Sequence, residues 1–144
     1  MEIHLHSPLY YTYACEAPTV NVIGVESAGT PSYLELIDKK VLENADSFLR
    51  LGIARTDIYS LAGILNEKYC TNVWKDQQYL PEIVSQLETP DVITKRLKLA
   101  YRRFGGLIKY VGPDCGLGAW PNQRIAFILL SNVAQGIRNF RENL

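Results

Sequence analysis

Four residues of this chain are of types that bind transition metals, namely His4, His6, Glu26 and Cys115. The two histidines are separated by a single residue, so on a strand both imidazoles point to the same face. Their Cα atoms would then lie roughly 6.6 Å apart, at about 3.3 Å per residue. Imidazole nitrogens, a carboxylate oxygen and a thiolate sulfur together form a suitable set of tetrahedral zinc ligands. Such a site could also hold a substrate thiol as its thiolate, the nucleophilic form.

Each candidate also has a simpler interpretation. Two histidines near the start of a chain are often surface residues, and Glu26 could cap the turn that follows it. Cys115 lies in a Pro-Asp-Cys-Gly turn that could be merely a connection between a strand and a helix. Asp57 could simply pair with a neighbouring basic side chain. The residue types alone therefore leave both interpretations open.

The overall composition excludes several classes of protein. The 144 residues are 47% hydrophobic, which is enough for one domain with a core. Fifteen basic and fifteen acidic residues cancel, so nothing electrostatic indicates nucleic acid or an anionic membrane surface. The three cysteines are an odd number and form no disulfide framework, so we expect a cytoplasmic, reducing location. We interpret Cys15 and Cys70 as packed or incidental thiols.

Short apolar runs alternate with longer segments of helical periodicity, which predicts parallel β/α units with right-handed crossovers. The strands are expected at Ile3–Ser7, Val20–Glu26, Ile53–Ser60 and Leu107–Val111. In such folds sites form at the carboxyl ends of the strands, which is where the candidate ligands fall. Four units make half of an eight-stranded barrel, although four strands could also form a small open sheet.

Capping signals mark the predicted helices. Ser32 and Glu35 form a capping box that predicts a helix ending near Gly52. Thr89-Pro90 predicts an N-cap followed by proline in the first turn of a helix that Gly105-Gly106 ends. The last helix is expected to start at Pro121 or Asn122, and a further helix and a loop are expected between residues 61 and 80.

Several of these motifs resemble those of one family. The run Val111–Leu117 resembles the P-D-C-G-L signature of the cobalamin-independent methionine synthase family, in the methionine synthase and uroporphyrinogen decarboxylase-like barrel superfamily. His4-Leu5-His6 takes the place of the family's H-x-C pair, and Glu26 matches its glutamate. The segment Asp57–Ser60 is similar to D-I-H-S, and Ile125–Arg141 is similar to the terminal helix. The resemblance covers nearly the whole chain, but only the second half of the family's catalytic barrel.

The resemblance implies one domain over residues 1–144, an α/β fold in which four parallel strands form half of a TIM-type barrel. It implies a zinc-dependent methyltransferase of methionine biosynthesis that transfers a methyl group to a thiol such as homocysteine. The methyl donor would be a methylfolate or a methylcorrinoid protein. The implied roles are zinc binding for His4, His6, Glu26 and Cys115, catalysis for Asp57 and Tyr59, and substrate binding for Ser60 and Asp114.

Departures from the family pattern favour an alternative, a non-catalytic half-barrel that serves as a metal-binding or assembly module. His6 replaces a cysteine and Tyr59 replaces a histidine, and the half of the barrel that contacts homocysteine in the family has no counterpart here. A third hypothesis is hydrolysis by a zinc-bound water on the same scaffold. Four barrel strands would leave two edges open, so we expect a homodimer or a complex with a chain that supplies the other half-barrel.

Overall fold

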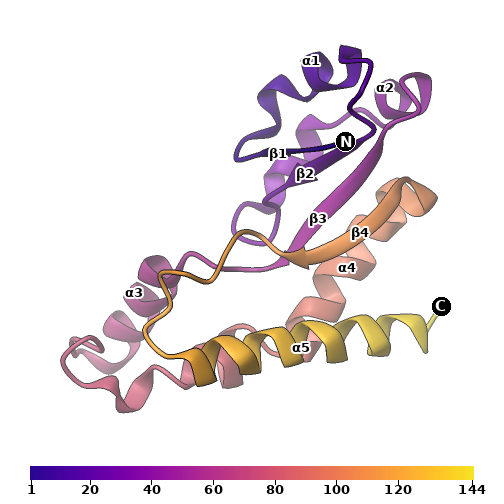
Figure 1. The fold of residues 1–144 in the computed structure, drawn as a ribbon. Coiled ribbons are helices and arrows are strands. Elements are labelled where there is room, and N and C mark those ends of the chain that lie inside the picture. The colour runs from indigo at the N-terminus through magenta and orange to yellow at the C-terminus, as the bar shows by residue number, and fades with distance from the viewer.

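The computed structural model describes residues 1–144 and contains a four-stranded, all-parallel sheet (Figure 1). Its strands follow the chain in the spatial order β1-β2-β3-β4. They are β1 (Glu2–Leu5), β2 (Val22–Val25), β3 (Phe48–Ala54) and β4 (Ile108–Pro113). The predicted α/β class of parallel β/α units, as in half of a TIM-type barrel, is confirmed. The sheet is open in this structure, with β1 and β4 at its two edges.

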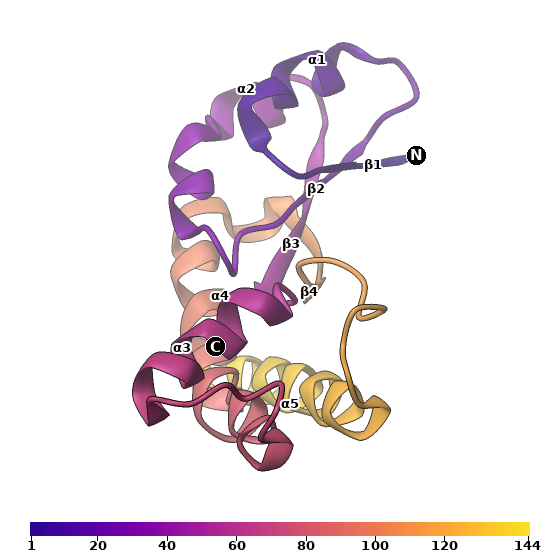
Figure 2. The same cartoon turned by 90° about the vertical axis from the view of Figure 1, so that its left-hand side faces the viewer.

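Helices connect all the strands and follow the last one. They are α1 (Tyr11–Glu16), α2 (Lys39–Asn44), α3 (Ile58–Tyr69), α4 (Pro90–Phe104) and α5 (Gln123–Arg141). Shorter 3-10 helices lie at Pro8–Tyr10, Pro31–Leu36, Gln77–Tyr79 and Gly105–Leu107, and a single π-helical turn lies at Ile83–Leu87. In Figures 1 and 2 the long helices α4 and α5 pack against each other, while α1 and α2 lie near β1 and β2.

One face of the sheet packs against the helices and forms the core. The buried strand residues on this face are Ile23, Val25, Leu49, Leu51 and Ile53, and they meet apolar side chains from α3, α4 and α5. Successive strand residues point to opposite faces, so the residues between them belong to the other face. Phe48 and Tyr110 lie on that opposite face and are not part of the core. His4 also lies on it, and this face therefore carries polar chemistry.

The prediction for residues 32–60 was wrong in its boundaries. The expected long helix is instead a 3-10 helix followed by the short α2, whose N-cap Asp38 accepts a hydrogen bond from the backbone of Lys40 at 2.9 Å. Asp46 then adopts a left-handed backbone with a φ of 49° and reverses the chain. The apolar spacing that indicated a long helix therefore runs through a turn and into β3.

The third strand begins earlier than predicted. It covers Phe48–Ala54, whereas the expected strand at Ile53–Ser60 ends inside α3. Gly52 was interpreted as a helix stop, but it belongs to β3 and pairs with Gly112 of β4. Pairing with β2 and β4 decides the position of this strand, and a local pattern does not contain that information.

The capping signals of the two long helices are confirmed. Thr89 caps α4 by accepting a hydrogen bond from the backbone N–H of Val92 at 3.3 Å. Asn122 caps α5 in the same way, with the backbone N–H of Arg124 at 2.8 Å. None of the helices combines the length and the apolar character needed to cross a membrane.

Candidate metal centre

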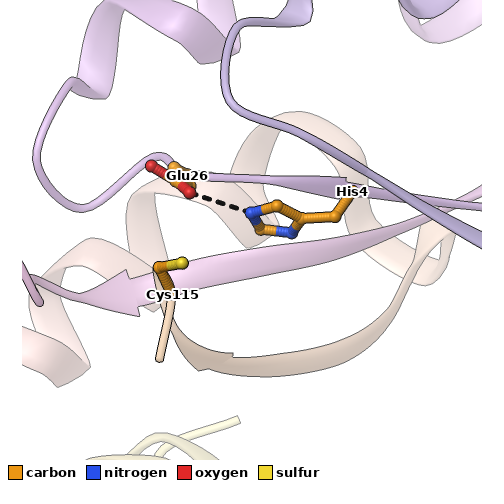
Figure 3. Close-up of side chains that lie close together, drawn as sticks. All are labelled: His4, Glu26 and Cys115. Atoms are coloured by element: carbon orange, nitrogen blue, oxygen red, sulfur yellow. Dashed lines mark hydrogen bonds and ion pairs between the residues drawn. The ribbon is translucent and has the colours of Figure 1, made fainter. Parts of the chain in front are cut away.

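Three of the four predicted metal ligands come together at the carboxyl end of the sheet. His4 belongs to β1, Glu26 directly follows β2, and Cys115 lies just beyond β4 (Figure 3). One potential ligand atom of each residue lies within 4.8 Å of those of the other two. The parallel pairing of β1 with β2 places His4 and Glu26 at the same end of the sheet. Cys115 reaches them because the chain after β4 turns back across the end of β3.

Contacts at the end of β3 hold this returning segment. The backbone N–H of Cys115 donates to Thr56 Oγ1 at 3.2 Å, and the indole Nε1 of Trp120 donates to the Thr56 carbonyl at 3.1 Å. The Cys115 thiol remains exposed. Thr56 was not identified from the sequence, where its position beside Asp57 was the only available signal. Its role depends on a segment about 60 residues away along the chain.

Both histidines contact the Glu26 carboxylate. His4 Nε2 lies 2.9 Å from Oε1, and His6 Nδ1 lies 2.9 Å from Oε2. Burial alone raises the pKa of Glu26, but the hydrogen bonds from the two histidines and their positive charge lower it below its ordinary value. The carboxylate is therefore ionised at neutral pH, which is the form that binds a cation.

His6 occupies a different place from the other three predicted ligands. Its side chain is 88% exposed, and it lies outside the group of mutually close ligand atoms. It contacts Oε2 of Glu26, whereas His4 contacts Oε1. A histidine in this place can orient a carboxylate ligand from outside the metal centre.

Asp114 fastens the loop after β2 to the loop after β4. The residue is 5% exposed, and its carboxylate accepts hydrogen bonds from the backbone N–H groups of Ala28 at 2.9 Å and Gly29 at 2.8 Å. Burial raises the pKa of Asp114 above its ordinary value in spite of these two bonds. Both carboxylate oxygens are engaged by the protein. Asp114, which the family resemblance assigned to substrate binding, therefore has a clear positioning role for the adjacent Cys115.

Gly52 provides the space for the Asp114 side chain. A Cβ atom on Gly52 would lie 1.8 Å from Oδ1 and 2.8 Å from the Cα atom of Asp114. Atoms cannot approach so closely, so only glycine fits beside this carboxylate. Ser27 reinforces the same junction by donating from its hydroxyl to the Gly52 carbonyl at 2.8 Å.

The residues assigned to catalysis lie at the start of α3. Arg55 binds the Asp57 carboxylate with two hydrogen bonds, from Nε at 2.9 Å and Nη2 at 2.6 Å. Burial raises the pKa of Asp57, but the Arg55 guanidinium outweighs that effect and lowers it. The simpler interpretation, that Asp57 pairs with a neighbouring basic side chain, is thus confirmed. Tyr59 is 72% exposed and its ring lies 5.5 Å from that of Trp74.

A cavity of about 160 Å³ lies beside the candidate ligands. The residues that line it are His6, Glu26, Gly29, Thr30, Tyr33, Thr56, Asp57 and Asp114. Tyr59 and Ser60 are not among them. The walls offer carboxylates, hydroxyls, the His6 imidazole and the Tyr33 ring, which suits a small polar molecule. A substrate in this cavity would meet Glu26 directly.

Comparisons with protein-family models, curated proteins and solved structures gave no match. The assignment of a function therefore depends on the geometry described above and on the motifs of the sequence.

Proposed function

We propose that this chain binds zinc through His4, Glu26 and Cys115, and that the centre prepares a thiol to accept a methyl group. The observation that carries the proposal is the convergence of a nitrogen, an oxygen and a sulfur donor within 4.8 Å of one another. This mixed set suits zinc, whereas calcium and magnesium prefer oxygen ligands alone. Three protein ligands also leave a coordination position open, as in catalytic zinc sites.

The surrounding residues have distinct parts in this proposal. When bound, zinc would lower the pKa of a substrate thiol and keep it as the thiolate at neutral pH. Asp114 and Thr56 hold the segment that carries Cys115, and His6 orients the carboxylate of Glu26. The adjacent cavity, which Glu26 lines, leaves room for part of a small thiol such as homocysteine. The methyl donor would be a methylfolate or a methylcorrinoid protein.

One observation favours a second candidate function, a non-catalytic half-barrel that binds metal or assembles with a partner. Tyr59 stands where the resembling family has a histidine, and its ring packs against Trp74 and does not line the cavity. No side chain at that position is then available to move a proton near the substrate sulfur. The first step, metal binding, is common to both candidates, and thiol uptake separates them.

The open edges of the sheet support a partner in either case. Strands β1 and β4 each pair on one side only, and unpaired strand edges are usually covered in native proteins. We propose a homodimer, or a complex with a chain that supplies the remaining strands of a barrel. Sedimentation at micromolar concentrations should give a dimer mass for the isolated chain in the first case. A stable monomer that recruits no second chain would contradict both.

Metal analysis of the purified protein tests the zinc site. The expected result is one zinc per chain in the wild type and its loss in Cys115→Ser. Cys70→Ser is the matched control, since Cys70 is also an exposed free thiol but lies outside the group. His6→Ala should retain zinc with an affinity roughly 10–100-fold weaker, as for the loss of an outer partner. Absence of bound metal under zinc-replete conditions would falsify the proposal.

Thiol uptake then distinguishes the two functions. X-ray absorption at the zinc edge should gain one sulfur neighbour when homocysteine is added to the zinc-loaded protein. Methyl transfer would be measured by mass spectrometry of the thiol product, with methylcobalamin and a methylfolate as separate donors. Zinc without sulfur uptake would support the assembly module and exclude the methyltransferase.

A further inference from the structure

Arg50 lies on the polar face of the sheet, in the same row of residues as His4. In the sheet register His4 pairs with Gly24, Gly24 pairs with Arg50, and Arg50 pairs with Tyr110. Directly paired residues of neighbouring strands point to the same face. The Arg50 side chain therefore leaves the sheet on the side of the candidate metal centre.

The guanidinium of Arg50 is incompletely bonded. Its Nη2 donates to the Pro113 carbonyl at 3.0 Å, and its Nε lies 3.6 Å from Glu2 Oε1, which is beyond hydrogen-bond distance. Its Nη1 is buried and has no hydrogen-bond partner, the one such side-chain atom in the structure. Buried polar groups in native proteins are almost always bonded, so a donor left in this state calls for an acceptor.

The Arg50 guanidinium lies beside the segment that leads to Cys115. The hydrogen bond to Pro113 places the guanidinium two residues before Cys115, and its Nη2 would be 3.5 Å from a Cβ atom on Gly112. On the other side, a Cβ atom on Gly24 would be 2.9 Å from His4 Nδ1. The same Cβ atom would be 3.1 Å from Glu2 Oε1, so the Glu2 carboxylate lies in the space over the sheet between His4 and Arg50.

We propose that Arg50 determines substrate specificity by binding a carboxylate of the thiol whose sulfur meets His4, Glu26 and Cys115. This inference rests on the proposed function. The planar guanidinium matches a carboxylate in two parallel hydrogen bonds. Glu2 only partly balances its charge and is 44% exposed, so an incoming carboxylate can displace it. A single guanidinium beside an acidic side chain favours a monoanion over a phosphate dianion.

The first experiment uses metal-free wild-type protein, so that it does not depend on zinc. The NMR signal of the Arg50 guanidinium is assigned by its absence from the spectrum of Arg50→Lys. This signal is then followed while propionate is added, with chloride used to keep the ionic strength constant. The expected result is a saturable shift of the Arg50 signal, with Arg138 on the surface of α5 unchanged as the internal control. No shift, or an equal shift of both signals, shows an ordinary structural contact with Glu2 and overturns the inference.

The second experiment uses the zinc-loaded protein and compares two thiols of the same chain length, one ending in a carboxylate and the other in a neutral hydroxyl group. We expect 3-mercaptopropionate to bind about tenfold more tightly than 3-mercaptopropan-1-ol, the difference expected from a hydrogen-bonded charge pair. Arg50→Gln should abolish this preference and leave the affinity for the neutral thiol unchanged. A parallel loss of both affinities would mean that Arg50 only supports the fold, and it would overturn the inference.

The two arms separate failure of this inference from failure of the proposed function. If the protein binds no zinc or neither thiol, the proposed function is wrong, and the propionate titration still decides whether Arg50 binds a carboxylate. If both thiols bind equally well and propionate leaves the Arg50 signal unchanged, the zinc site stands and Arg50 has no part in specificity.

Discussion

Replacing Gly52 with alanine should expel the Asp114 carboxylate from its site. The added Cβ atom would lie 1.8 Å from Oδ1 and 2.8 Å from the Asp114 Cα atom, so rotation of the side chain alone cannot relieve the clash. The backbone N–H groups of Ala28 and Gly29 would lose their acceptors. Leaving the buried Ala28 donor unpaired costs about 1–3 kcal/mol, whereas the exposed Gly29 N–H can bond water. Forcing the Cβ atom into occupied space costs about 1–3 kcal/mol more, so we expect a loss of about 2–6 kcal/mol in the free energy of unfolding.

The assay is urea unfolding followed by circular dichroism, with Gly63→Ala as the matched control. Gly63 lies inside α3, and a Cβ atom there would have no neighbour within 4 Å. Alanine at this position should raise the free energy of unfolding by about 0.5–1 kcal/mol, because it favours the helix. Both variants make the same chemical change, so the opposite signs isolate the steric effect at Gly52.

The Gly52→Ala variant also tests the connection between this junction and the candidate metal centre. Asp114 precedes Cys115, so displacement of Asp114 should weaken zinc binding as well as stability. Equal stability of Gly52→Ala and wild type, within about 0.5 kcal/mol of measurement scatter, would refute the close contact between Gly52 and Asp114. Unchanged zinc affinity in a destabilised variant would show that Cys115 is positioned by other contacts.

Two further predictions concern the ion pairs. Glu88 is 1% exposed and accepts two hydrogen bonds from Arg96, so Glu88→Ala should lower the free energy of unfolding by about 2–4 kcal/mol. Glu43→Ala, which removes an exposed ion pair, is the control and should lower it by under about 0.5 kcal/mol. Urea unfolding measures both changes. Arg55 lowers the pKa of Asp57, so the stability from that pair is present above the ordinary aspartate pKa and is lost as pH falls through the lowered value. Asp57→Asn should therefore flatten the acid limb of stability below about pH 4, by under 1 kcal/mol since the carboxylate is partly exposed. An unchanged acid limb in this variant would contradict that reasoning.

The parts of the fold with strong local signals could be predicted from the sequence. Thr89-Pro90 and Asn122 define the starts of α4 and α5, and both helices have a long apolar stripe. Four parallel strands follow from the alternation of apolar runs with helical segments. The convergence of His4 and Glu26 follows from their places at the ends of adjacent strands.

The remaining features depend on contacts between distant segments. The position of β3 is decided by its pairing with β2 and β4, and by the fit of Gly52 beside Asp114. Neither contact leaves a periodic signal in the sequence. The same holds for Thr56, whose hydroxyl and carbonyl hold the segment around Cys115. His6 differs from its predicted place because one residue beyond β1 the strand geometry no longer fixes the imidazole.

The separation of the candidate ligands along the chain has a consequence for folding. An ion shared by His4 and Cys115 would close a loop of roughly 110 residues, and the entropy removed by such a closure grows with the logarithm of its length. The ion would act as a reversible cross-link between β1 and the segment after β4, and so between the two edge strands of the sheet. Strand β1 has only four residues and one neighbour, so it depends most on this tether. Metal availability would then govern how often this edge of the molecule opens, and amide hydrogen exchange in β1 would report the occupancy of the centre.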